Sequence, residues 1–358
     1  MSEFSTTLIA WQKVHGRHDL PWQNTTEPYA IWVSEIMLQQ TQVAAVIGYY
    51  SKFMQRFPSI LSLAQATQEE VLQHWSGLGY YSRARNLHNA AGIIMDTHKG
   101  VFPSDVSQMQ SLPGIGRSTA AAIASFAFNQ IETILDGNVK RVLSRHFLVE
   151  GWTSSPKVEK ILWLKAESLL PENDMIAYTQ GLMDLGATLC TRSKPKCAQC
   201  PLKASCQAFS EYRTKDLPTP KTKKSTLQKQ TTMLLILDGN EVLLEKRPPS
   251  GIWGGLWTLP EISMQEIASE VAIKRFGLEV EAEEPLASFQ HVFTHFKLEI
   301  LPQPLQVTRK LIKASAPNTT WLPIDDAISA AIPAPVRKIL QSLQSGLAVT
   351  ERTPPIFF

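Results

Sequence analysis

The chain has 358 residues, of which 44% are hydrophobic and 19% are charged, and its formal net charge is +3. This composition excludes a disordered or fibrous protein, and the length allows two domains with their own hydrophobic cores. The most apolar run, Ala120 to Phe128, is too short to span a bilayer, and the N-terminus lacks the pattern of a secretory or transit signal. We therefore expect a soluble, cytoplasmic protein.

The charges are distributed unevenly along the chain. Residues 1–230 contain 24 Lys and Arg against 18 Asp and Glu, whereas residues 231–358 contain 11 against 14. A mildly basic N-terminal part is compatible with contacts to phosphate groups, although charge alone does not establish them.

The first part of the chain has the periodicity of helices. Leu8 to His15 is expected as a short amphipathic helix, and Tyr29 to Gln40 as a helix that is apolar on nearly all sides and therefore buried. Glu35 lies in the middle of this buried helix, where desolvation raises the pKa of a carboxyl group. The alternative is that Glu35 forms an ion pair with an arginine. Further helices are expected at Ile47 to Phe57 and Gln68 to Trp75.

Two glycine turns each lead into a helix. Residues 77–85 read GLGYYSRAR, and residues 112–116 read LPGIG before an Ala-rich helix at Ser118 to Phe128. Such a turn directs free N–H groups and the positive end of a helix dipole at one point, which suits a phosphate. The two tyrosines of the first turn could stack on bases or pack in the core.

A carboxylate follows the second turn. Asp136 precedes Gly137 and a helical run at Val139 to Leu148, so it is expected as the N-cap of that helix. An ordinary interhelical turn followed by a capping aspartate would give the same pattern.

All four cysteines lie within seventeen residues, with the spacing C-x6-C-x2-C-x5-C. Two disulfides are unexpected in a chain without a secretion signal. Four thiolates around one metal centre are favoured, either zinc or an iron–sulfur cluster. The single close pair fits zinc less well than a cluster with wider steps.

The amino-acid composition and the hydrophobic pattern of the sequence change after residue 211. Residues 212–230 are rich in Pro, Thr and Lys and are expected as a linker. Thr232 to Leu237 and Glu241 to Glu245 are expected as strands of a hairpin, Gln265 to Phe276 as a helix, and Leu286 to Ile300 as strand. The C-terminal part is therefore an α+β domain, and its final residues are expected as a disordered tail.

Several motifs occurring in order resemble one family. LPGIGRSTAAAI followed by ILDGNVKRV resembles the helix-hairpin-helix signature of DNA glycosylases. Together with WVSEIMLQQTQV, GLGYYSRARNL, MDLGATLCTRSKPKCAQCPL and RPPSGIWGGLW, it is similar to the MutY-type adenine DNA glycosylase family over about residues 8–340.

The resemblance implies a mainly α-helical glycosylase region at residues 1–211, made of a six-helix barrel and a lobe with one 4Fe–4S cluster in the loop 190–206. A linker at 212–230, a Nudix-like 8-oxoguanine-recognition domain of α+β type at 231–345 and a tail at 346–358 would follow. The implied protein is a prokaryotic, nucleoid-associated monomer that binds duplex DNA with A:8-oxoguanine or A:G mispairs, and a protein partner of the tail has no support.

The family also implies roles for single residues. Glu35 matches the general acid that protonates adenine, Asp136 the carboxylate that faces the positively charged sugar and stays ionised at its N-cap, and Asn138 a residue that positions sugar or water. The remaining matches are Gln40, Tyr80, Pro113, Gly114, Gly116, Ser118 and Lys140 for DNA binding, Trp22, Leu38 and Gln180 for the adenine pocket, Phe293, Thr294 and His295 for 8-oxoguanine, and Cys190, Cys197, Cys200 and Cys206 for the cluster.

Two departures from related patterns define the expected activity. Ser118 occupies the position where the bifunctional lyases of the endonuclease III type carry a Schiff-base lysine, so we expect a monofunctional glycosylase of base excision repair. Ile273 and Lys274 occupy the place of a glutamate pair in a working Nudix box, so metal-dependent pyrophosphatase activity is not expected. The alternatives are a lyase for oxidised pyrimidines and a non-catalytic iron–sulfur sensor of DNA damage.

Overall fold

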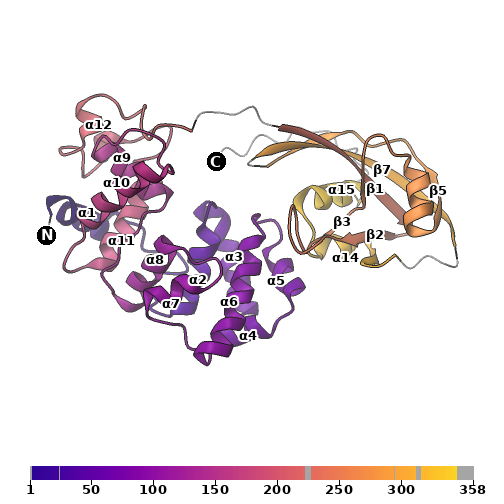
Figure 1. Cartoon of the computed structure of the whole chain (residues 1–358), viewed down its shortest axis with the longest axis horizontal. Coiled ribbons are helices and arrows are strands. Elements are labelled where there is room, and N and C mark those ends of the chain that lie inside the picture. The colour runs from indigo at the N-terminus through magenta and orange to yellow at the C-terminus, as the bar shows by residue number, and fades with distance from the viewer. Residues whose placement is uncertain (1, 24, 222–226, 294, 312–315, 345–358) are drawn as a thin grey trace. The chain divides into compact units, whose positions relative to one another are not determined.

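The structure is a computed structural model that describes residues 2–23, 25–221, 227–293, 295–311 and 316–344. It divides into two compact units (Figure 1). The first unit contains Met1–Gln65 and Asn86–Lys223, and the second contains Ala66–Arg85 and Lys224–Phe358. Among the described helices, none combines the length and the apolar character that a membrane span requires.

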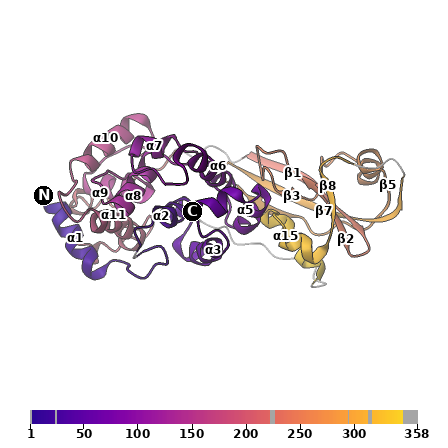
Figure 2. The same ribbon diagram turned by 90° about the horizontal axis from the view of Figure 1, so that it is seen from below.

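The first unit is helical. Helix α2 lies between α3 and α8 (Figure 2), and α9 lies beside α10 and α12 (Figure 1). The helices are α1 (Glu3–His15), α2 (Pro28–Leu38), α3 (Val43–Arg56), α4 (Ile60–Gln65), α6 (Ser82–His98, which begins in the second unit), α7 (Val106–Ser111), α8 (Arg117–Phe128), α9 (Gly137–His146), α10 (Pro156–Glu167), α11 (Met175–Asp184) with its π-helical extension η1 (Leu185–Leu189), the short turn η2 (Cys197–Gln199) and α12 (Gln207–Ser210).

Helix α2 is buried as its composition predicts. Pro28 occupies its first turn, and Trp32, Val33 and Met37 have no exposed surface. The neighbouring helix α8 is rich in alanine, and these small side chains allow α2 to approach closely. Glu35 is therefore held on a rigid, well-packed helix.

A second core joins α1 to α9, α10 and α11. It contains Leu8, Val139, Leu162 and Leu182, all buried. Helix α1 begins five residues earlier than expected, because Ser2 caps it and Phe4 is buried in the same core. This packing fixes α9, which carries Asp136 at its start, against α11.

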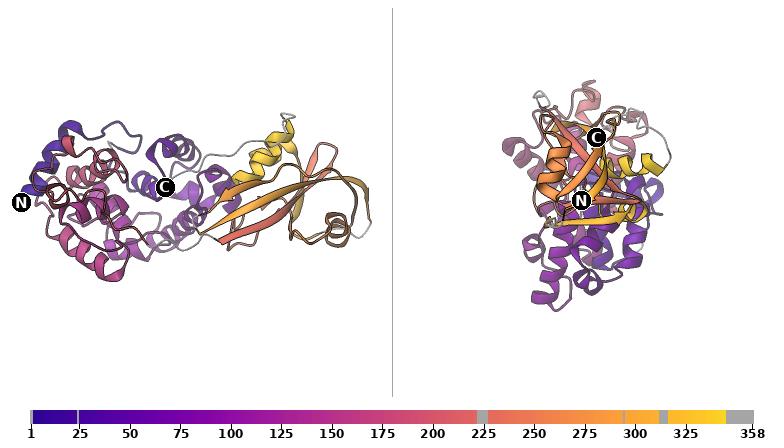
Figure 3. Two further views of the ribbon diagram at one scale, coloured as in Figure 1. Left: turned by 90° about the horizontal axis from the view of Figure 1, so that it is seen from above. Right: turned by 90° about the vertical axis from the view of Figure 1, so that its right-hand side faces the viewer.

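The second unit contains a twisted mixed sheet. Its strand order is β3-β2-β1-β7-β5, with β4 paired to β1, β6 to β7 and β8 to β2, and β1 runs parallel to β7. Figure 3 shows α15 on one face of this sheet and the α13 turn on the other. The elements are α5 (Gln68–Trp75), β1 (Leu227–Asp238), β2 (Glu241–Lys246), β3 (Trp257–Thr258), β4 (Glu261–Ile262), α13 (Ala268–Val271), η3 (Ala272–Phe276), β5 (Leu278–Ala282), β6 (Phe289–Val292), β7 (Phe296–Lys310), β8 (Thr319–Pro323), α14 (Ile324–Ser329) and α15 (Ala334–Gln344).

Three expectations for this unit were wrong in extent. The helix expected from Gln265 begins at Ala268 and continues as the π-helical turn η3, because Ala268 is the first residue of this stretch that packs against the core of the sheet, followed by Val271, Ala272 and Phe276. The single strand expected from Leu286 to Ile300 is a hairpin, since β6 and β7 pair antiparallel. Strand β1 also begins at Leu227, inside the stretch expected as linker.

The segment Ala66–Arg85 packs with the C-terminal domain, although it comes from the helical part of the sequence. The Ser76 hydroxyl donates to the Ile332 carbonyl at 2.7 Å and accepts from Arg337 at 2.8 Å. Arg85 donates to the Gly254 carbonyl at 2.7 Å. The glycine turn at residues 77–79 is thereby anchored to the domain that carries β1 to β8. The boundaries proposed for the domains from sequence stay a prediction.

Candidate active site

The first unit contains a cavity of about 620 Å³. Its lining includes Glu35 and Leu38 from α2, Trp22 from the preceding loop, and Gln180 from α11. The catalytic and pocket residues expected from sequence therefore meet in one cavity, except for Asp136 and Asn138, which are not among the lining residues. A space of this size accommodates a nucleobase.

The Glu35 carboxyl group has a pKa well above its ordinary value. Removal from water raises the pKa of its carboxyl group to about 8, and the negative charge of nearby Asp136 contributes to the same shift. No described cation forms an ion pair with Glu35, so the alternative expected from sequence does not apply within the described residues. The group can act as an acid toward a ligand in the cavity.

Asp136 is the N-cap of α9, as expected. One oxygen of its carboxylate accepts from the Val139 amide at 2.8 Å, and the other accepts from the Asn138 side chain at 3.2 Å. These donors favour the ionised form predicted from the sequence, and burial opposes it. Burial outweighs both donors and the nearby charge of Arg141, and the pKa of Asp136 is raised.

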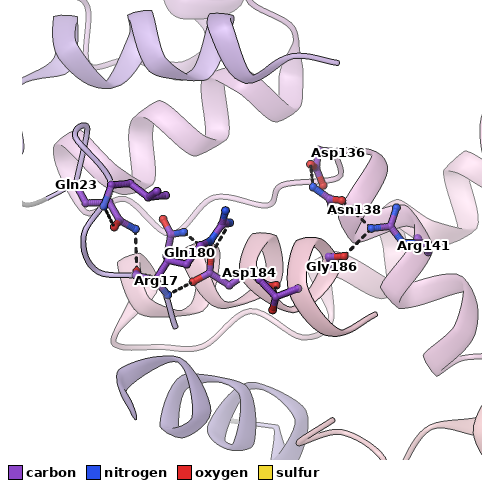
Figure 4. Close-up of polar contacts among 10 residues, drawn as sticks. Arg17, Gln23, Asp136, Asn138, Arg141, Gln180, Asp184 and Gly186 are labelled. Atoms are coloured by element: carbon purple, nitrogen blue, oxygen red, sulfur yellow. Dashed lines mark hydrogen bonds and ion pairs between the residues drawn. The ribbon is translucent and has the colours of Figure 1, made fainter. Parts of the chain in front are cut away.

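Asn138 is fixed by two contacts (Figure 4). Its side-chain oxygen accepts from Arg141 at 2.7 Å, and the same guanidinium donates to the carbonyls of Gly186 and Cys190. Gly186 lies so close that an added Cβ would stand 2.6 Å from the Asn138 Cβ. A glycine at this point therefore allows the start of α9 to sit close against η1.

The hairpin between α7 and α8 has the geometry of an anion site. Gly114 has φ of 83°, which favours glycine, and Gly116 is the N-cap of α8 without a side-chain cap. Gly114 and Gly116 are exposed and Pro113 is partly exposed. The Ser118 hydroxyl accepts from the Leu135 amide at 3.0 Å and so holds the loop that leads into Asp136.

Lys140 lies on α9 with an ionic partner. Its ammonium group is 2.7 Å from the Glu159 carboxylate, and 16% of its side chain is exposed. Gln40 is exposed just after α2, with φ of 56°.

The four cysteines line one small cavity of about 30 Å³. Arg145, fully buried, donates to the Cys190 sulfur at 3.3 Å, and burial, with a smaller contribution from the other three cysteines, raises the pKa of the Cys200 thiol to about 11. In the described part of the chain, no three His, Cys, Asp or Glu side chains are arranged to hold a single metal ion. The four thiols line a common space.

The second unit contains an aromatic cluster. Phe293 stacks on Phe296 at 4.4 Å and contacts Trp253 and His291. His295 is exposed, and Thr294 lies outside the described residues.

Tyr80 has φ of 49° and an exposed fraction of 36%, with the Arg83 guanidinium 5.5 Å from its ring centre.

The Nudix-box positions face solvent. Ile273 and Lys274 are exposed on η3, and neither can supply a carboxylate. Glu261, an acidic residue of the same region, is ion-paired with Arg247 at 3.2 Å.

Sequence reasoning missed two residues at the cavity. Arg17 lines it, and Asp184, buried at the end of α11, binds Arg17 and Gln180. The sequence pattern that indicates Asp184 is its position one helical turn after Gln180, as the one acidic residue of α11.

The comparisons with known proteins cover both units. Residues 33–168 match the HhH-GPD superfamily base excision DNA repair protein, and residues 232–342 match the NUDIX domain. Adenine DNA glycosylase of Buchnera aphidicola from Acyrthosiphon pisum is 39% identical over 96% of this chain and 98% of that protein, and the Mus musculus enzyme is 32% identical over 95% and 78%. A thermostable thymine-DNA glycosylase superimposes with a TM-score of 0.53 and 29% identity over 58% of this chain and 95% of its own. The chain belongs to the adenine DNA glycosylase family.

Proposed function

We propose that this chain is a monofunctional DNA glycosylase that removes adenine mispaired with 8-oxoguanine or guanine in duplex DNA. It hydrolyses the N-glycosidic bond and leaves an abasic site. The observation that carries the proposal is a buried carboxyl group, Glu35, at the wall of a cavity of nucleobase size, with a second carboxyl group near enough to raise its pKa.

The two carboxyl groups divide the chemistry. Glu35 donates its proton to the base, which makes the base a better leaving group. Asp136, held by the Val139 amide and Asn138, faces the positive charge that develops on the sugar. The two groups favour opposite protonation states in each other, because a negative charge on Asp136 favours the neutral form of Glu35 and a neutral Glu35 leaves Asp136 free to be charged.

The DNA contacts follow from the exposed backbone. The uncapped start of α8 at Gly116 offers N–H groups to a phosphate, and Pro113 and Gly114 let the strand approach. Gln40 and Tyr80 each have a positive φ, and we assign both to DNA binding. Trp22, Leu38 and Gln180 would enclose the extruded base.

The C-terminal domain would read the opposite base. The supporting observation is the aromatic group of Trp253, His291, Phe293 and Phe296, which includes Phe293 from the set expected to contact 8-oxoguanine. Exposed Ile273 and Lys274 leave the Nudix metal set without its glutamate pair, so recognition rather than hydrolysis is the role we assign to this domain.

A panel of duplexes tests the assignment. Each contains A, T or thymine glycol opposite 8-oxoguanine, guanine or adenine, and base release and binding are measured separately. We expect release of adenine opposite 8-oxoguanine and guanine. Release of oxidised pyrimidines would favour the lyase alternative, and binding without release would favour the sensor.

Strand cleavage gives the next prediction. Ser118 has a hydroxyl group instead of an amine, and this hydroxyl accepts from the Leu135 amide. The Lys140 amine forms an ion pair with Glu159, so the site offers no free amine from these two residues to attack the abasic sugar. We expect little covalent complex on borohydride treatment, and any trace to disappear in Lys140→Ala. Efficient trapping that survives Lys140→Ala contradicts the monofunctional assignment.

The cysteine cavity gives a further prediction. Cys190, Cys197, Cys200 and Cys206 fit one 4Fe–4S cluster, which would serve as a structural anchor for the loop next to α9 and as a one-electron redox centre. We expect the pure protein to be brown and to contain about four iron atoms per chain, and Cys200→Ser to lose iron. A colourless protein with stoichiometric zinc contradicts the cluster.

A further inference from the structure

Gln180 is held by a buried carboxylate. Its side-chain Nε2 donates to Oδ1 of Asp184 at 2.8 Å, and both residues stand one turn apart on α11 (Figure 4). Asp184 can only accept hydrogen bonds when ionised, so the amide nitrogen, and not the amide oxygen, must face it. Because the amide is planar, fixing its nitrogen also fixes its oxygen.

Arg17 binds the carboxyl group of Asp184 through three donors. The guanidinium of Arg17 meets Oδ1 through Nε at 2.7 Å and Nη2 at 2.6 Å, and its backbone amide donates to Oδ2 at 2.9 Å. The side chain of Asp184 is 1% exposed and that of Arg17 is 24% exposed. Together with the Gln180 amide, four donors bind this buried carboxyl group and fix its position.

The carbonyl oxygen of Gln180 is the atom that remains for a ligand. Gln180 lines the cavity together with Glu35 and Trp22, and its bond to Asp184 is the one hydrogen bond of its side chain within the described residues. The cavity wall thus presents a hydrogen-bond acceptor. A 6-amino group can donate to such an acceptor, whereas a 6-oxo group would place a second acceptor against it.

We propose that Asp184, held by Arg17, is a positioning residue that orients the Gln180 amide, and that this orientation selects a 6-aminopurine over a 6-oxopurine in the cavity. The proposal deepens the proposed function and rests on it. An unpaired buried acceptor weakens binding roughly ten- to hundredfold, which sets the size of the selection to be measured.

The test compares two bases in one enzyme. Single-turnover release of adenine and of hypoxanthine opposite 8-oxoguanine is measured in duplexes that are otherwise identical. We expect wild type to favour adenine. Gln180→Met, which keeps the length of the side chain but has no acceptor of this kind, should reduce the ratio roughly tenfold or more.

Asp184→Asn separates positioning from packing. An asparagine of the same shape can donate to Gln180, so the Gln180 amide can turn and present its NH₂ to the cavity. The adenine rate should then fall while the hypoxanthine rate holds or rises. If Asp184→Asn leaves Arg17 as an uncompensated charge and the variant does not fold, Asp184→Asn with Arg17→Gln removes both charges and gives the same comparison.

A matched ion pair serves as the control. Lys13 on α1 and Asp174, the N-cap residue of α11, form an ion pair at 2.9 Å but are about half exposed, and Lys13 does not line the cavity. Lys13→Met should leave the ratio unchanged. If the Asp184 variants slow both bases in proportion, Asp184 has only a structural role and the proposal is overturned. If wild type releases no adenine at all, the proposed function fails instead.

Discussion

Glu35→Gln should reduce the single-turnover release of adenine by at least about a thousandfold, because it removes the proton donor at the cavity. Glutamine has the same shape, so duplex binding should stay within a few-fold of wild type. The measurement is single-turnover excision from an A:8-oxoguanine duplex, with binding measured on the same duplex by gel shift. Retention of more than a tenth of the wild-type rate contradicts the role of Glu35.

The matched control for this variant is Glu27→Gln. Glu27 is exposed at the start of the same helix, accepts from the Tyr29 amide and does not line the cavity. The same chemical change there should leave the rate close to wild type. A comparable loss in both variants would point to helix α2 as a whole rather than to the proton of Glu35.

The pH dependence of wild type follows from the raised pKa. Since the acid must be protonated and its pKa is about 8, the rate should fall tenfold per pH unit above that pH. The free energy of unfolding also depends on the protonation of Glu35. The folded state retains it up to about pH 8, whereas the unfolded chain releases it near pH 4.5, so folding loses stability as pH rises through this window.

Glu35→Gln removes this loss and should be more stable than wild type at pH 8, by roughly 2 kcal/mol. Converting the full pKa shift at about 1.4 kcal/mol per pKa unit would give a larger stability difference. We expect less because Glu35 lines a cavity, where solvent reduces the cost of its charge. Thermal unfolding at pH 5 and pH 8 measures the effect. An advantage of the variant that does not grow with pH contradicts the assigned pKa.

Asp136→Asn should reduce adenine release roughly a hundredfold to a thousandfold, because the sugar cation loses its facing charge. Asparagine is as good an N-cap as aspartate, so α9 should stay folded. Loss of the Asp136 charge also lowers the pKa of Glu35, so the alkaline fall of the residual rate should begin at a lower pH than in wild type.

The control for this variant is Asp105→Asn. Asp105 caps α7 through the Gln108 amide in the same way, but it is exposed and does not line the cavity. The rate of Asp105→Asn should match wild type. An unshifted alkaline fall in Asp136→Asn would mean that the two carboxyl groups do not act on each other.

Local pattern was sufficient for several parts of this protein. The run at residues 29–40 predicts a buried helix with an acidic group inside it, and the pairing of Asp136 with Gly137 predicts an N-cap, because both depend on neighbours within a few residues. Residues 265–276 were predicted less well, because helical periodicity does not reveal how much of a stretch the sheet can cover.

The sequence by itself determined the buried acid, the capped carboxylate, the glycine hairpin and the four grouped thiols, since each is encoded by residues close together in the chain. Only the tertiary structure decided that Glu35, Trp22 and Gln180 line one cavity, that Asp136 acts on the pKa of Glu35, and that Arg17 and Asp184 meet across 167 positions. Pairings between distant residues and the loss of water around them depend on how helices pack, and no local pattern records that packing.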